Sequence, residues 1–198
     1  LYHKIPEELY PIDHAVFLKG KTSFYVVATN CRTGKPEYLQ VCDLYRDVDY
    51  VRASSSLPLL ARMVELHGEQ YLDGGVSDPV PVLKAMELGC DKVITVLTRH
   101  RGFRKGAEVS VPLIRGKYHR YPNLIHDMKV RHTVYNDTLS RIGKLEREGR
   151  IFVIAPERPL DIRRSEKNRE RLRAGYDHGY TIAKELMPRM RQYLYGVR

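Results

Sequence analysis

The chain has 198 residues, 42% of them hydrophobic, which is enough for one domain with its own core. Because its 34 Lys and Arg residues exceed its 24 Asp and Glu residues, the protein is cationic at neutral pH and suited to anionic surfaces. The sequence contains no apolar run long enough to span a bilayer, so we expect any contact with a membrane to be peripheral.

The three cysteines, Cys31, Cys42 and Cys90, are odd in number and widely spaced. This spacing favours neither a disulfide framework nor a paired-cysteine metal site, and it fits a reducing compartment. The first twenty residues lack the basic and apolar regions of a secretory signal. We therefore expect a cytoplasmic protein. The first residue is leucine and not methionine, which suggests a piece of a longer chain.

The first predicted elements are two strands and a helix. Residues 23–30, "SFYVVATN", are rich in β-branched and aromatic side chains, and residues 35–41 follow them after a turn at Gly34. This pattern predicts a β-hairpin. A helix is expected to start at Asp47 and to end at the serines that precede Pro58, because proline disfavours a helical conformation in the residue before it.

A third strand, residues 69–72, leads into the motif Asp73-Gly74-Gly75. The segment "SDPVPVLKAMELG" then predicts a helix, with Ser77 or Asp78 as its N-cap and Pro79 at its first position. Gly89 is expected to close this helix in a left-handed conformation.

The next segment, "KVITVL" at residues 92–97, is apolar with little polar interruption, as in a strand that is covered on both faces. Strand, helix and buried strand in this order predict an α/β protein with a mostly parallel sheet. Asp73 would then lie at the C-terminal end of its strand, where open α/β sheets place their sites.

The remaining chain predicts a basic loop over residues 99–120 and a helix over residues 124–149. A buried strand, "RIFVIAP", follows, and residues 165–195 are expected to be helical. There is no internal repeat and no long linker, so we expect residues 1–198 to form a single domain.

Asp73 is the main candidate for chemistry. A carboxylate at a strand end, followed by Gly74 and Gly75, can accept a proton from a hydroxyl that approaches it closely, since glycine has no Cβ to block the approach. The alternative is that Asp-Gly-Gly only makes a tight turn. These three residues alone leave both interpretations open.

The wider context resembles the patatin-like phospholipase family, in its bacterial branch. The segments "VRASSSLP", "GEQYLDGGVSDPVPVLKA" and "GCDKVITVLTR" are similar in order and spacing to the second half of that family's α/β domain. "FYVVATNCRTGKPEYL" and "RIFVIAPERPL" also match. The stretch from Arg52 to Arg99 is far more specific than the three-residue motif.

The resemblance implies a three-layer α/β fold, with a mostly parallel sheet flanked by helices and incomplete at its N-terminal side. It also implies a lipid acyl hydrolase, a phospholipase or carboxylesterase, with a Ser–Asp dyad and no cofactor. Asp73 would be its general base, Gly74 and Gly75 would keep the approach open, and the substrate would be a lipid or another ester.

The chain departs from the family because it has no Gly-x-Ser-x-Gly nucleophile elbow and no glycine-rich oxyanion loop before Asp73. Only Ser77 has a glycine two residues before it, and Pro79 occupies the position of the second glycine. We therefore expect no nucleophile in this chain, and an inactive fragment of an active parent protein. The eight histidines lack the close pairing of a helical zinc site, so no metal is expected either.

A cluster of basic residues lies in the predicted loop that directly follows the strand at residues 92–97. It consists of Arg99, Arg101, Arg104, Lys105, Arg115, Lys117 and Arg120. Arg99, Arg101, Arg104 and Lys105 are candidates for binding phospholipid headgroups at the inner membrane surface, although a solvated loop would have the same composition. The alternative function is a non-catalytic module that binds anionic membranes or partners through this loop.

Two further expectations concern partners. The basic run at residues 163–173 interleaves acidic residues, which is typical of an exposed helix face, and no stacking motif or zinc finger accompanies it. We therefore expect no binding to nucleic acid. A sheet that lacks strands exposes an edge that invites pairing, so the fragment is expected to self-associate.

Overall fold

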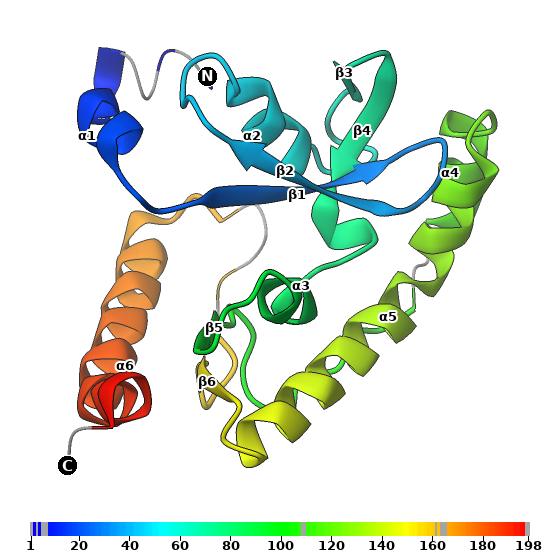
Figure 1. Ribbon diagram of the computed structural model, residues 1–198. Coiled ribbons are helices and arrows are strands. Elements are labelled where there is room, and N and C mark those ends of the chain that lie inside the picture. Colours follow the sequence, from blue (N-terminus) through cyan, green and yellow to red (C-terminus); the bar gives the residue numbers. More distant parts are fainter. Residues whose placement is uncertain are drawn as a thin grey trace. The chain divides into compact units, whose positions relative to one another are not determined.

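The computed structural model describes residues 2, 4, 8–107, 110–160, 162 and 166–196 (Figure 1). Its internal contacts divide the chain into two compact units. Unit 1 comprises Leu1–Pro81 and Gly106–Tyr135, and unit 2 comprises Val82–Lys105 and Asn136–Arg198. The expectation that residues 1–198 form a single domain stays a prediction.

Unit 1 is built on a four-stranded sheet of order β2-β1-β4-β3 (Figure 1). Its strands are β1 (Phe24–Asn30), β2 (Pro36–Val41), β3 (Val64–Leu66) and β4 (Glu69–Asp73). The predicted hairpin of β1 and β2 is confirmed, and Gly34 in its turn has a φ of 76°. The short helix α1 (His14–Lys19) precedes the sheet in sequence.

All three strand pairs of this sheet are antiparallel, so the prediction of a mostly parallel sheet is wrong for unit 1. The reason lies in the short connections. β3 and β4 are joined by His67 and Gly68, whose φ angles of 52° and 79° are those of a tight turn between adjacent antiparallel strands. The α/β class itself is confirmed, because strands and helices alternate along the chain.

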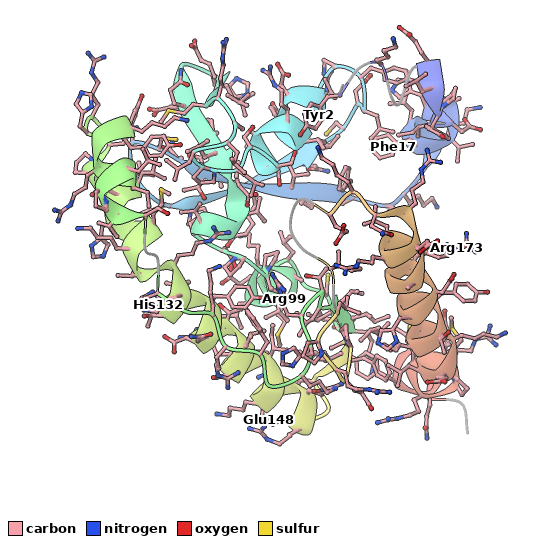
Figure 2. All side chains as sticks on the ribbon, turned by 180° about the vertical axis from the view of Figure 1, so that it is seen from behind. Tyr2, Phe17, Arg99, His132, Glu148 and Arg173 are labelled. Atoms are coloured by element: carbon pink, nitrogen blue, oxygen red, sulfur yellow. The ribbon has the colours of Figure 1, made fainter. Side chains whose placement is uncertain are left out.

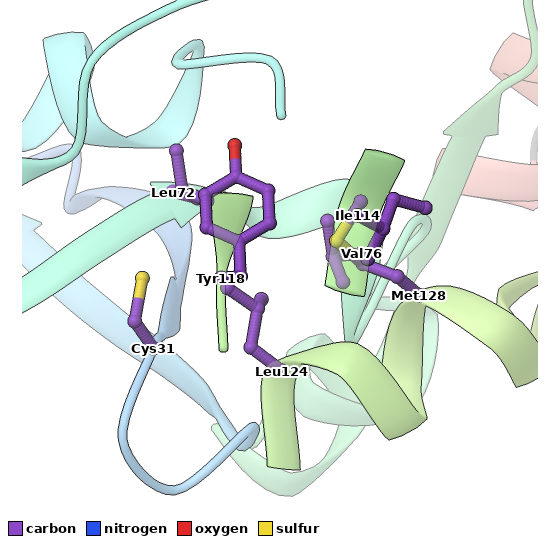
Figure 3. Close-up of a cluster of buried hydrophobic side chains, with 7 residues drawn as sticks. All are labelled: Cys31, Leu72, Val76, Ile114, Tyr118, Leu124 and Met128. Carbon is purple, nitrogen blue, oxygen red and sulfur yellow. The ribbon is translucent and has the colours of Figure 1, made fainter. Parts of the chain in front are cut away.

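Helices cover both faces of this sheet. The helix α2 (Val48–Ser54) packs on one face, where Ala53 joins Ala28, Val64, Leu66 and Tyr71 in a buried cluster. The other face carries Leu72, since neighbouring residues of a strand point to opposite sides. Leu72 lies in a second cluster with Cys31, Val76, Ile114, Tyr118, Leu124 and Met128 (Figure 3).

This second cluster is formed by α4 (Val111–Lys117) and the start of α5 (Pro122–Arg147). Tyr118 is 1% exposed, and its hydroxyl accepts a hydrogen bond from the Leu59 backbone N–H at 2.8 Å. The loop that was predicted over residues 99–120 therefore contains a helix. Gly116 did not prevent it, because the Ile114 and Tyr118 side chains on the same segment are buried against the core.

Unit 2 contains the parallel strands β5 (Val93–Val96) and β6 (Ile151–Ile154), with the helices α3 (Val82–Glu87) and α6 (Arg169–Tyr195). The expectation that β5 is covered on both faces is wrong. Val93 and Thr95 are buried, whereas Val96 is 67% exposed. No described residue of α6 is buried, and its side chains project around the helix (Figure 2).

The helix after the glycine motif starts later than predicted. Pro79 precedes α3, which begins at Val82. Gly74–Val76 instead form a 3-10 helix, η2, and Ser77 is its C-terminal cap instead of an N-cap of α3. Gly89 has a φ of 86°, so the predicted left-handed residue after α3 is confirmed. None of the helices in the described parts of the chain is both long and apolar enough to cross a bilayer.

Asp47 forms the N-terminal boundary of α2, as predicted, but its carboxylate does not cap the helix. It is buried and accepts hydrogen bonds from the Arg46 side chain and from the backbone N–H groups of Cys42 and Asp43. Chiefly because of Arg46, the pKa of Asp47 falls to about 2.

This depressed pKa predicts an acid-sensitive contribution to stability. A carboxylate whose pKa is lower in the folded state stabilises it at pH values above 3.8, and the effect disappears as the pH falls through 2. We expect Asp47→Asn to lower the free energy of unfolding by about 2 kcal/mol at pH 7. Denaturant titrations should show this difference shrinking between pH 4 and pH 2. Asp49→Asn, on the exposed side of α2, is the control and should change stability by less than about 0.5 kcal/mol.

Candidate active site

Asp73 is the last residue of β4, as predicted, and unit 1 fixes its backbone from two sides. Its N–H donates to the Ser56 carbonyl oxygen at 2.9 Å, and its carbonyl oxygen accepts from the Thr29 hydroxyl at 2.9 Å. Thr29 lies on β1 and is fully buried. Because β4 is antiparallel to β1, the placement of Asp73 does not follow the rule for parallel sheets that suggested it.

The Asp73 carboxylate is held by the motif itself. Its Oδ1 accepts a hydrogen bond from the Gly75 backbone N–H at 2.7 Å. The Gly75 carbonyl oxygen in turn accepts from Nε of Arg131, on α5, at 2.6 Å. A Cβ on Gly75 would lie 2.9 Å from Oδ1 and 3.2 Å from Nη2 of Arg131. The absence of a side chain at position 75 therefore lets the carboxylate keep its orientation.

Gly74 has a different role. It is buried, and a Cβ at this position would overlap the backbone carbonyl group of Val27 on β1. Asp73 pairs with Ala28 of β1, and the next residue, Gly74, lies directly against the backbone of β1. The distance between the two backbones leaves no room for a side chain at position 74. The two glycines thus serve two needs, since Gly74 admits the backbone of β1 and Gly75 admits the carboxylate.

The Ser56 and Ser77 hydroxyl groups have hydrogen-bond partners other than the Asp73 carboxylate. The Ser77 hydroxyl lies 2.8 Å from the Thr29 hydroxyl, and the Ser56 hydroxyl donates to the Arg52 carbonyl oxygen at 2.7 Å. The thiol of Cys31 is buried in the core below, and burial raises its pKa to about 12, so it stays protonated and is a poor nucleophile.

Sequence reasoning missed two residues of this site, Thr29 and Arg131. They are separated from their partners by 44 and 56 positions, and each stands in an element that was predicted only for its regular structure. Asp78 was predicted as a helix cap, but its Oδ2 accepts from the Tyr38 hydroxyl at 2.6 Å. No local signal distinguishes these contacts.

The candidate headgroup residues belong to unit 2, whereas Asp73 belongs to unit 1. Arg101 forms two hydrogen bonds of 2.8 Å with the carboxylate of Glu146. The Arg99 guanidinium lies 5.1 Å from the Phe103 ring centre, and Arg104 donates to the Phe103 carbonyl oxygen. The backbone N–H of Lys105 donates to Asn136. Headgroup binding by these residues stays a prediction.

Metal chemistry has no apparent centre in the described regions. Within residues 8–107, 110–160 and 166–196, His, Cys, Asp and Glu side chains form no group of three that could hold a metal ion.

Comparison with known proteins assigns two segments of the chain. Residues 19–86, which include β1, β4 and the glycine motif, match a family model described as patatin-like phospholipase. Residues 121–195 match one described as a domain of unknown function (DUF6363). The chain is also 32% identical over 148 residues to the uncharacterized protein YjjU of Escherichia coli (strain K12), an alignment that covers 73% of this chain and 41% of YjjU. The chain thus spans about two fifths of the length of that relative.

Proposed function

Since residues 19–86 match the patatin-like phospholipase family model, we propose that this chain carries the general base of a lipid acyl hydrolase. Asp73 is that base, and the nucleophilic serine comes from outside these 198 residues. The observation that carries the proposal is the carboxylate at the end of β4, which the Gly75 N–H holds by one oxygen. The class of enzyme is the serine esterases, and the substrate is a lipid or a smaller ester.

In the proposed reaction, Asp73 acts twice. It first accepts the proton of the serine hydroxyl as the serine oxygen attacks the ester carbonyl carbon. The tetrahedral intermediate then expels the alcohol, which takes up the proton, and leaves an acyl-serine. Asp73 next accepts a proton from water as the water oxygen attacks the acyl carbon, and a second tetrahedral intermediate forms. This intermediate breaks its bond to the serine oxygen, which takes the proton back from Asp73, and the carboxylic acid is released. Since Oδ1 is engaged by Gly75, Oδ2 is the oxygen that takes the proton.

The match of residues 19–86 to this family model also supports our proposals of a three-layer arrangement for the complete domain and of peripheral contact with a membrane. A cytoplasmic location stays a prediction. The alternative, a non-catalytic module that binds anionic surfaces through Arg99–Lys105, has less support. Arg101 is already paired with Glu146, and such a pair leaves less positive charge for a headgroup. Self-association of the fragment stays a prediction, for which light scattering is the direct measurement.

The proposal is tested by locating the nucleophile. A fluorophosphonate probe, which labels activated serines, should not label the 198-residue chain, and the chain should not hydrolyse a short-chain nitrophenyl ester. The native protein should do both, and mass spectrometry of its labelled peptides should place the probe on a serine outside these residues. Labelling of Ser54, Ser55, Ser56 or Ser77, or turnover by the isolated chain, would show that the proposal is wrong.

A further inference from the structure

Two of the cavities in the described part of unit 2 adjoin each other beside α6. The first, with a volume of about 450 Å³, is apolar and lies where β5 and β6 end, since Val96 and Ile154 are the last residues of these strands and both line it. Ligands of α/β proteins commonly bind at the carboxyl ends of parallel strands. We refer to it as the apolar cavity.

The wall that α6 gives to the apolar cavity combines small and aromatic residues. Gly179 leaves open space beside the helix, since a Cβ at this position meets nothing within 4 Å, whereas the Ile162 side chain packs against Gly175. The rings of Tyr176 and Tyr180 are stacked with their centres 6.4 Å apart. Both tyrosines are more than half exposed. An exposed aromatic pair beside an apolar cavity favours a ligand that brings apolar surface with it.

The second cavity, of about 650 Å³, is polar and carries charged side chains. Its arginines are Arg101, Arg147, Arg158 and Arg189, and its acidic residues are Glu146, Glu157 and Glu185. Arg101 and Glu146 neutralise each other through their paired hydrogen bonds. Three arginines then face two glutamates, so the polar cavity retains one net positive charge.

The two cavities share a wall, because Ala155 and Ile182 line both of them. An apolar space that adjoins a cationic one matches an amphiphile with one negative charge at one end. Each volume is within the range of about 300–1,000 Å³ that small-molecule sites have. The arginine guanidinium group is also well suited to a carboxylate, which it can bind through two parallel hydrogen bonds.

We propose that unit 2 binds a long-chain fatty acid, with the alkyl chain in the apolar cavity and the carboxylate among the arginines of the polar cavity. Most of the residues that line these cavities belong to the segment 121–195, which matches a domain of unknown function. The inference goes beyond the proposed hydrolase function, because it requires neither Asp73 nor a nucleophilic serine.

Binding can be measured on the 198-residue chain by displacement of a fluorescent fatty acid, with oleate below its micellar concentration. Oleate should bind at least a hundredfold more tightly than decanoate, because fewer methylene groups of decanoate are buried. Oleyl alcohol, which has the same chain without the charge, should bind about tenfold more weakly than oleate. Equal affinities for oleate and oleyl alcohol would overturn the proposal.

Two variants address the two cavities separately. Gly179 lines the apolar cavity and a Cβ on it meets nothing within 4 Å, so Gly179→Leu should keep the helix and place its side chain in the cavity. It should weaken oleate binding at least tenfold, and Arg189→Gln should weaken it about fivefold. The matched controls are Gly116→Leu in α4, where a Cβ is equally unhindered, and Arg191→Gln, which lies outside both cavities.

The control variants should bind oleate like the parent chain, and circular dichroism should show the same helix content in all of them. Unchanged affinity of both Gly179→Leu and Arg189→Gln would refute the assignment. The outcome is independent of catalysis, since Asp73→Asn should bind oleate with parental affinity. Loss of ester hydrolysis by Asp73→Asn in the native protein, together with parental oleate binding by the same variant, would separate the two proposals.

Discussion

Asp73→Asn is expected to lower kcat/KM of the native protein for ester substrates by about 1,000- to 10,000-fold. Asparagine keeps an oxygen that can accept the Gly75 N–H bond, so the turn at η2 and the end of β4 should stay folded. However, the asparagine amide is not basic enough to accept the serine proton, which is the role of Asp73 in the proposed mechanism. Nitrophenyl ester hydrolysis measures the loss, and fluorophosphonate labelling should slow in parallel.

Asp78→Asn is the matched control for this substitution. Asp78 lies five residues after Asp73, and its carboxylate accepts a hydrogen bond from the Tyr38 hydroxyl. We expect its removal to change kcat/KM by less than about tenfold, since only one hydrogen bond is weakened. If Asp73→Asn kept more than a tenth of the parental activity, Asp73 would not be the general base.

Much of the fold of unit 1 could be predicted because the signals are local. The β-branched run of β1 and the turn at Gly34 predict a hairpin from neighbouring residues, and the three serines before Pro58 give the end of α2 correctly. The direction of the sheet could not be predicted in this way. It depends on which strands become neighbours, and β3, with three residues, is too short to give a pattern.

The error at β5 has a related cause. An apolar run such as "KVITVL" is typical of a strand covered on both faces, yet Val96 is 67% exposed in unit 2. Periodicity reports which residues favour burial, and it does not report whether a second layer is present. The late start of α3 also reflects tertiary structure, because the Ser77 hydroxyl pairs with Thr29 from β1 instead of capping a helix.

For the candidate site too, the residues that are contiguous in sequence could be predicted, and those brought together only by folding could not. Asp73 and its glycines could be found because the strand end and the turn are contiguous in sequence. Thr29 and Arg131 could not, since only the folded chain brings β1 and α5 to the motif. The family resemblance added a role for Asp73 that the residues alone left undecided between a turn and a base.

Gly74→Ala is expected to destabilise the protein by about 3 kcal/mol, a large effect for the addition of one methyl group. The new Cβ would overlap the Val27 carbonyl group, and the obstacle is backbone that is itself paired in the β1–β2 ladder. Relief therefore requires β1 and β4 to separate near Asp73. Gly75→Ala should cost less stability, because the nearest atom at 2.9 Å is the Asp73 carboxylate oxygen, which can rotate away.

Gly106→Ala provides the control, since a Cβ at that position meets nothing within 4 Å and its backbone is not left-handed. It should leave the urea midpoint of unfolding unchanged, whereas Gly74→Ala should lower it by about 1–2 M for a slope of typical size. Because the chain forms two compact units, the midpoint should be followed by a probe that reports on unit 1, such as the reaction of the Cys31 thiol with a thiol reagent, since this thiol is buried in the folded core. An unchanged midpoint for Gly74→Ala would mean that close contact with β1 is not the reason for glycine at this position. The reason would then be sought in the chemistry at Asp73.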